Sequence, residues 1–249
     1  MRYNNLIIQT LNNIMNIAYY TYFYGSDDNQ AFSIPDIPST KYPCFYFTNN
    51  RSMFNTLENT PWIGIFIDKP TTDDIIQSNM EGKHVKVLPH EYKELRDFDY
   101  TVMFDSKAGL INEGFVEGAI QTLFVNNTFA MTMREHWFYQ NRKKDEYESI
   151  WNEYEVAMQC DRYKIQKDQY KSYIDEQLSR GFSHKTKDHC ACGFIIRNMK
   201  HPKIKVIDYT WYSHVLQCGI EDQISFFFAK QPFMDYIYSF RDNPYLVKY

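Results

Sequence analysis

The chain has 249 residues, of which 44% are hydrophobic and 23% are charged, and this composition excludes a disordered, collagen-like or low-complexity protein. The formal net charge of -4 argues against a nucleic-acid-binding protein, which would carry a basic patch or stripe. The five cysteines are an odd number, the start has no secretion signal, and no run approaches about 18 apolar residues. We therefore expect a cytoplasmic, reducing location and no membrane span.

The first half of the chain alternates apolar runs with polar turns. Residues 1–16 predict a short N-terminal helix. Three strands follow, and each ends in polar turn residues, as buried parallel strands do. A helix ends at Pro89 and leads into a fourth strand. The expected ranges are 18–24, 44–48 and 62–67 for the three strands, 82–88 for the helix and 100–104 for the fourth strand.

The second half continues the alternation with more helix. A long charged helical region over 145–180 is interpreted as a lid or as a surface for a partner, such as the second copy in a homodimer. The whole pattern predicts an α/β fold over 1–249, a single domain with a mainly parallel central sheet flanked by helices. The other expected elements are helices at 113–124, 203–216 and 222–240 and strands at 129–133 and 193–196.

Asp105 directly follows the fourth strand, at the kind of sheet edge where open α/β folds bind ligands. Its carboxylate can hold a divalent cation or accept hydrogen bonds from a ligand sugar, and Lys107 can neutralise a phosphate. An Asp at a strand end also commonly caps the following turn. Both interpretations stay open.

Glu221 and Asp222 open the last predicted helix. Carboxylates are favoured there by the helix dipole and by free backbone N–H groups, so capping is one interpretation. The other is that one of them acts as a general base. Desolvation by the run Phe226-Phe-Phe228 would raise its pKa towards the range useful for deprotonating a hydroxyl.

Two further groups of residues are candidates for ligand or metal binding. His184, His189, Cys190 and Cys192 suggest zinc, although their spacing fits no established closed zinc site. His136 follows a strand, where it either touches a ligand or simply packs.

Several common nucleotide-binding and hydrolase motifs are absent from the sequence. It contains no Walker-type loop, no G-x-G-x-x-G and no G-x-S-x-G. A phosphate-loop, dinucleotide or hydrolase-elbow site is therefore not expected.

Taken in order, several segments resemble a family of GT-A-like (Rossmann-like) glycosyltransferase domains of largely unassigned specificity, found in plant Golgi proteins and in microbial and viral polysaccharide-building proteins. The resemblance runs from about residue 17 to 230. The matching motifs are Tyr22-Phe-Tyr-Gly25, Phe47-Thr-Asn-Asn50, Lys83-His-Val-Lys-Val-Leu-Pro-His90, Phe98-Asp-Tyr-Thr-Val-Met-Phe-Asp-Ser-Lys107, Arg134 with His136, Gly193-Phe-Ile-Ile-Arg197 and Glu221-Asp-Gln-Ile-Ser-Phe226.

The resemblance implies a hexosyl- or pentosyl-transferase that moves a sugar from a nucleotide-diphosphate sugar to a hydroxyl of a glycan or other acceptor. Asp222, with Glu221 beside it, would supply the general base. Asp105 would hold Mn²⁺ or Mg²⁺ at the diphosphate. Lys107 stands where the family's second metal-binding Asp is expected, so it could itself supply the positive charge.

The resemblance also implies the donor-binding residues, and it leaves one alternative from another class. That alternative is a non-catalytic carbohydrate- or nucleotide-sugar-binding protein that retains the fold. Beside Asp105 and Lys107, the implied donor-binding residues are Tyr22, Tyr24, Lys83, His90, Arg134, His136 and Arg197.

Overall fold

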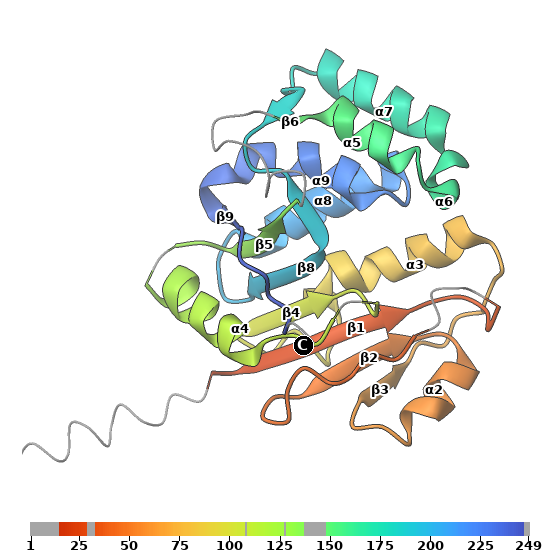
Figure 1. Ribbon diagram of the computed structural model, residues 1–249, viewed down its shortest axis with the longest axis vertical. Helices are drawn as coiled ribbons and strands as arrows, with labels where there is room; N and C mark the ends of the chain where they lie inside the picture. Colours follow the sequence, from red (N-terminus) through yellow and green to blue (C-terminus); the bar gives the residue numbers. More distant parts are fainter. Residues whose placement is uncertain (1–14, 29–32, 108, 127, 137–147, 247–249) are drawn as a thin grey trace, which may run out of the picture.

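A computed structural model describes residues 15–28, 33–107, 109–126, 128–136 and 148–246 of the chain. Most of the N-terminal helix expected over 1–16 lies outside these residues. Seven strands form one sheet in the order β3-β2-β1-β4-β8-β5-β9 (Figure 1). Their bounds are Ile17–Phe23 (β1), Cys44–Thr48 (β2), Ile63–Phe66 (β3), Tyr100–Phe104 (β4), Met131–Glu135 (β5), Cys190–Asn198 (β8) and Ile237–Phe240 (β9).

The sheet is mainly parallel, which confirms the predicted α/β class. Among the described strands of this sheet, β8 alone runs against its neighbours, pairing antiparallel with both β4 and β5. Strands β2 and β3 extend the sheet on one side of β1, and β4 pairs with β1 on the other side. The strand order therefore reverses between β1 and β4. In open α/β sheets such a reversal opens a crevice at the carboxyl ends of the two strands.

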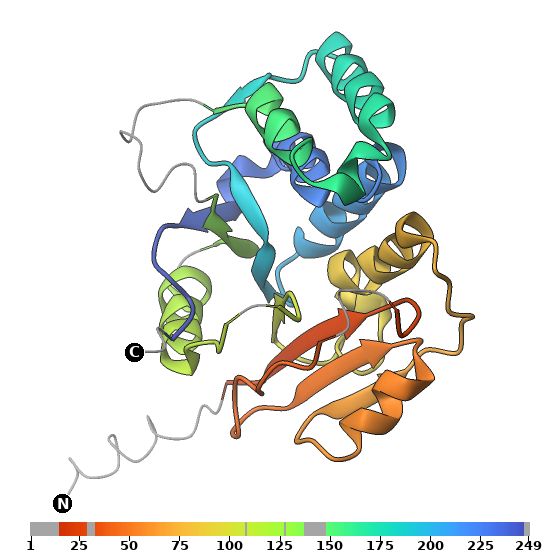
Figure 2. The same ribbon diagram turned by 45° about the vertical axis from the view of Figure 1, so that its right-hand side comes forward.

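Helices cover both faces of the sheet (Figures 1 and 2). On one face, α3, α8 and α9 pack against residues such as Tyr20, Met103 and Ile195. On the other, α2 and α4 pack against Tyr46 and Val102. The bounds are Arg51–Leu57 (α2), Ile75–Val87 (α3), Glu113–Ile120 (α4), Ile204–Cys218 (α8) and Asp222–Ala229 (α9), with short turns of helix at Pro89–Glu91 (η1), Gln121–Val125 (η2) and Gln231–Tyr236 (η4).

A third apolar cluster joins the sheet layer to a helical cap over residues 148–186. Buried residues of the cap, among them Ile150, Tyr170 and Ile174, pack against Ile224 and Phe227 of α9. The cap holds α5 (Ile150–Ala157), α6 (Asp161–Lys164) and α7 (Lys167–Ser179), and it begins and ends in a two-stranded ribbon, β6 (Glu148–Ser149) and β7 (Lys185–Thr186).

Three sequence expectations need correction. The region 145–180 is three helices rather than one in its described part, since α5 and α6 are separated by a turn at which Cys160 caps α6. The helix expected over 222–240 ends at Ala229, because Pro232 lacks the N–H that would continue it, and the chain returns to the sheet as β9. Strand β3 is partly exposed rather than buried, because it forms an edge of the sheet.

No helix within the described ranges is both long and apolar enough to cross a bilayer.

Candidate active site

A pocket of about 180 Å³ lies at the carboxyl ends of β1 and β4, where the strand order reverses. It is smaller than the usual site for a drug-sized ligand. The lining residues are Tyr22, Phe23, Tyr24, Ser78, Asn79, Lys83, Lys86, Asp105, Ser106, Lys107, Arg162, Tyr163 and Asp222.

The floor of the pocket is an ion cluster of Lys83, Lys86, Asp105 and Asp222. Lys83 and Lys86 stand three residues apart on α3, so the helix presents both ammonium groups on one face. Both ammonium groups contact the same oxygen of Asp222, Oδ2, at 2.7 Å from Lys83 and 2.6 Å from Lys86. Lys86 Nζ also lies 3.5 Å from Asp105 Oδ1. We call these four residues the pocket ion cluster.

The lysines set the protonation state of Asp222. Burial by itself disfavours its carboxylate, but the ammonium groups of Lys83 and Lys86 outweigh burial and hold the pKa of Asp222 well below its usual range. The expectation that neighbouring Phe residues raise this pKa is therefore wrong for Asp222. Lys86 shows the converse effect, since Asp105 and Asp222 outweigh its burial and hold its pKa well above the usual value.

Glu221 lies directly behind Asp222 and is 3% exposed. It caps α9, because its side chain accepts a hydrogen bond from the Gln223 backbone N–H at 3.0 Å. Burial, helped by the charges of Asp222 and Glu153, raises its pKa to about 7. The sequence predicts a raised pKa for one of these two carboxylates, and the structure shows it for Glu221. Glu221 does not line the pocket.

Asp105 does not have the surroundings of a divalent-cation ligand. Its side chain is 53% exposed, and the nearest charged partner is the ammonium of Lys86, which repels a cation. Within the described residues, the one group of three close His, Cys, Asp or Glu side chains excludes Asp105. The residues present here therefore do not fit Mn²⁺ or Mg²⁺.

Gly193 of β8 packs closely against Asp105. The backbone N–H of Asp105 donates to the Gly193 carbonyl, and a Cβ at position 193 would lie 2.9 Å from Asp105 Oδ2.

Aromatic side chains form one wall of the pocket. Tyr22 and Tyr24 come from the end of β1, with ring centroids 6.4 Å apart. Burial raises the pKa of both phenols, so both stay neutral at physiological pH. Gly82 of α3 faces this wall, and a Cβ there would lie 2.6 Å from the Tyr22 ring. Flat, neutral rings of this kind suit the face of a sugar or a nucleobase.

Arg197 and His90 lie away from the pocket. The expectation that Arg197 reaches a ligand at the binding edge is wrong, because β8 is antiparallel and its end pairs with the start of β4. Arg197 is fully buried and donates to Asp208 at 3.0 Å, to the Tyr20 hydroxyl and to the Lys86 carbonyl. His90 Nδ1 lies 3.5 Å from the same Asp208.

Arg134 lies near the end of β5 and His136 directly follows it, at the edge that carries Asp105, but neither lines the pocket. His136 is 2% exposed and lies with Glu153 and His189. Burial, with a smaller contribution from His189, lowers the pKa of His136 to about 4. The suggested zinc set is also rearranged, because His189 groups with these residues rather than with Cys190 and Cys192.

Three ionisable lining residues were not singled out from the sequence. Lys86 lies inside the motif that begins at Lys83, and its three-residue spacing was the available signal. Arg162 and Tyr163 come from α6 of the cap, and nothing in the local sequence links that segment to β1 and β4. The pocket thus brings together residues of β1, α3, β4, α6 and α9.

Comparisons with known proteins give distant structural similarities, and two of them are described here. No family profile and no curated protein matches the chain. Mouse xyloside xylosyltransferase 1, in its apo form, shares 8% identity at a TM-score of 0.47, over 90% of this chain and 84% of that chain. The apo structure of the bifunctional glycosyltransferase WbbM shares 13% identity at a TM-score of 0.44 over 91% of this chain, which spans 39% of the WbbM chain. At these levels the likeness does not extend to the roles of individual residues.

Proposed function

We propose that the protein transfers a sugar from a nucleotide-diphosphate sugar to a hydroxyl of a glycan or other acceptor. The observation that carries the proposal is the pocket ion cluster at the β1/β4 reversal of strand order. This is the position where open α/β folds bind nucleotides, and it holds both the cations that a diphosphate needs and a carboxylate that an acceptor hydroxyl needs. The motifs around Asp105 and Asp222 resemble those of glycosyltransferases.

The charges around the pocket favour an anionic ligand. The whole chain has a net charge of -4, yet cationic side chains outnumber carboxylates in the lining. Ammonium and guanidinium groups form strong, charge-assisted hydrogen bonds with phosphate oxygens. The cationic lining residues are Lys83, Lys86, Lys107 and Arg162, against Asp105 and Asp222.

A bound diphosphate also changes what Asp222 can do. Without a ligand, Lys83 and Lys86 hold Asp222 ionised and only weakly basic. A diphosphate would compete for both ammonium groups, and the pKa of Asp222 would then rise because its counter-charges are shared. Donor binding would in this way prepare the base.

The transfer step follows from these positions. The acceptor hydroxyl gives its proton to the Asp222 carboxylate while its oxygen forms a bond to the anomeric carbon. The bond between that carbon and the diphosphate oxygen breaks, and the leaving nucleoside diphosphate keeps the electron pair. Lys83, Lys86 and Lys107 stabilise the charge that develops on it. An attack opposite the leaving group inverts the anomeric carbon.

In this proposal the ammonium groups take the role that a metal ion has in other enzymes. Because Lys86 lies between Asp105 and Asp222, we propose that transfer does not depend on added Mn²⁺ or Mg²⁺.

The test is a panel of uridine-, guanosine- and thymidine-diphosphate sugars, each with and without Mn²⁺. We expect at least one donor to raise the melting temperature and to be hydrolysed or transferred under both conditions. If no donor binds in either condition, the proposal fails.

Asp222→Asn separates catalysis from binding. We expect it to keep donor binding and to lose at least about a hundredfold in transfer rate, as is typical when a general base is removed. Asp175→Asn, on the exposed face of α7, is the matched control and should transfer at the normal rate. Unchanged turnover in Asp222→Asn would remove Asp222 from the mechanism.

The same measurements address the non-catalytic alternative. A chain that binds a nucleotide sugar tightly but neither hydrolyses nor transfers it, with any acceptor offered, would be a nucleotide-sugar-binding protein.

A further inference from the structure

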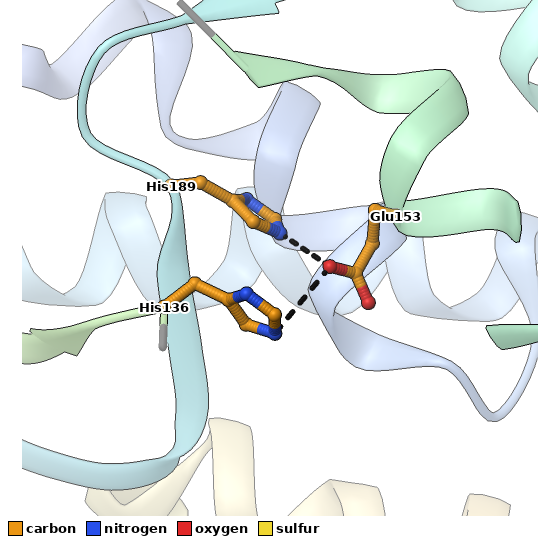
Figure 3. Close-up of side chains that lie close together, drawn as sticks. All are labelled: His136, Glu153 and His189. Carbon is orange, nitrogen blue, oxygen red and sulfur yellow. Dashed lines mark hydrogen bonds and ion pairs between the residues drawn. The ribbon is translucent and has the colours of Figure 1, made fainter. Parts of the chain in front are cut away.

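A second group of buried polar residues lies outside the pocket. Glu153 Oε2 is 2.7 Å from His189 Nε2 and 3.6 Å from His136 Nε2, so one carboxylate oxygen faces both rings (Figure 3). The ring centroids of the two histidines are 5.0 Å apart. The side chains of all three are at most 3% exposed. One donor atom from each residue lies within 4.8 Å of the others.

The backbone holds these three residues together. His136 directly follows β5 and His189 directly precedes β8, and these two strands pair antiparallel through Glu135 and Cys190. The His136 N–H donates to the His189 carbonyl at 2.8 Å, which continues the ladder by one step. Glu153 reaches the pair from α5 of the cap. Gln223 of α9 fixes its second oxygen by donating from Nε2 to Glu153 Oε1 at 2.7 Å.

We propose that His136, Glu153 and His189 bind a zinc ion. Two imidazoles and one carboxylate form an established set of protein ligands for zinc, whereas Mg²⁺ and Ca²⁺ prefer oxygen ligands alone. Three protein ligands leave one position on a tetrahedral ion for a small molecule such as water.

Two of the three separations between the ligand atoms are close to those of a zinc site. Bonds of 2.0 to 2.1 Å at tetrahedral angles place neighbouring ligand atoms roughly 3.3 Å apart. The separations of 2.7 and 3.6 Å lie on either side of that value. The longer one exceeds a hydrogen bond, so a bound ion would draw His136 and Glu153 slightly closer together.

Zinc at this position would fasten the cap to the sheet. Two of its ligands flank the strand pair β5 and β8, and the third belongs to α5. The same cap carries Arg162 and Tyr163 into the pocket. None of the three ligands lines the pocket, so zinc binding can be measured without an assay of sugar transfer.

The test uses the full chain, purified, dialysed against a chelator and then titrated separately with Zn²⁺, Co²⁺ and Mg²⁺. We expect about one Zn²⁺ per chain and a rise in melting temperature of roughly 5 °C or more, with no effect of Mg²⁺. Co²⁺ should give the visible absorption of a four-coordinate site.

Glu153→Gln and His136→Asn should each weaken Zn²⁺ binding by more than about a hundredfold. His184→Asn, at an exposed position just before β7, is the matched control and should bind Zn²⁺ normally. Asp105→Asn should also bind it normally, which separates this site from the pocket.

Two results would overturn the proposal. One is a wild-type chain that neither retains Zn²⁺ nor melts at a higher temperature in its presence. The other is full Zn²⁺ affinity in both Glu153→Gln and His136→Asn, which would place the ion elsewhere.

Discussion

Two buried ion pairs meet at Lys86, and only one of them opens onto a pocket. Arg197 and Asp208 are both 0% exposed, and Arg197 donates to the backbone carbonyl of Lys86. The side chain of Lys86 instead pairs with Asp222, in a cluster whose outer member, Asp105, is 53% exposed. The chemistry is the same in both places. A buried charge pair therefore does not by itself indicate function; what differs is whether a charged ligand can reach it.

The largest expected effect comes from breaking the buried Arg197–Asp208 pair, which does not open onto the pocket. Arg197→Met leaves Asp208 buried without its main partner, and we expect the free energy of unfolding to fall by about 3 to 5 kcal/mol. Denaturant unfolding measures this. Donor affinity of the folded protein should change little, because Arg197 does not line the pocket.

The double variant Arg197→Met/Asp208→Leu is the control, since replacing both charges with apolar groups often restores stability. If folded Arg197→Met cannot bind a donor that the wild type binds, the Arg197–Asp208 pair also supports ligand binding, and the difference between the two ion pairs is contradicted.

A medium effect on stability concerns Glu221, the buried carboxyl next to Asp222 of the pocket ion cluster. Its pKa is raised from 4.5 to about 7, so the folded protein holds a proton that the unfolded chain has already lost. Stability should therefore fall as the pH rises from about 4.5 to 7, by on the order of 2 kcal/mol. Glu221→Gln should remove this fall.

Unfolding free energies of wild type and Glu221→Gln at pH 5 and pH 8 give the measurement. The lowered pKa of Asp222 acts in a different range, because its contribution is lost only as the pH falls below its unfolded pKa of 3.8. Equal pH dependence in the two proteins would contradict the prediction for Glu221.

The smallest expected effect is at the mouth of the pocket. Lys107 is exposed, so water and salt screen its charge. Lys107→Ala should weaken donor binding by about two- to fivefold, and the loss should shrink at high salt. Lys171→Ala, exposed on α7, is the control. A loss as large as that of removing a buried lysine would mean that Lys107 acts as the main diphosphate contact.

The sequence predicts the strands better than the ends of the helices. The strands at 44–48 and 100–104 agree with β2 and β4, because short apolar runs between polar turns are local signals. β9 could not be recognised as readily, since Ile237-Tyr-Ser-Phe240 continues an apolar helical pattern, although Pro232 marks the break. The direction of β8 depends on pairing with β4, which no local pattern specifies.

Part of the candidate site can be predicted from the order of the motifs along the chain. Asp105, Asp222 and Lys83 were expected near one another, and the structure brings them together. The pKa of Asp222 could not be obtained in this way, because it depends on two lysines that lie far away in the sequence. The grouping of His136, Glu153 and His189 likewise depends on how the cap folds back over β5 and β8.

Gly82 makes the width of the pocket depend on one missing methyl group. A glycine inside a helix costs about 1 kcal/mol relative to alanine, and at this position the space it leaves is filled by the Tyr22 ring. Alanine would stabilise α3 in isolation, but its Cβ would displace the Tyr22 ring, which lines the pocket. The residue at position 82 therefore links the stability of α3 to the shape of the pocket wall.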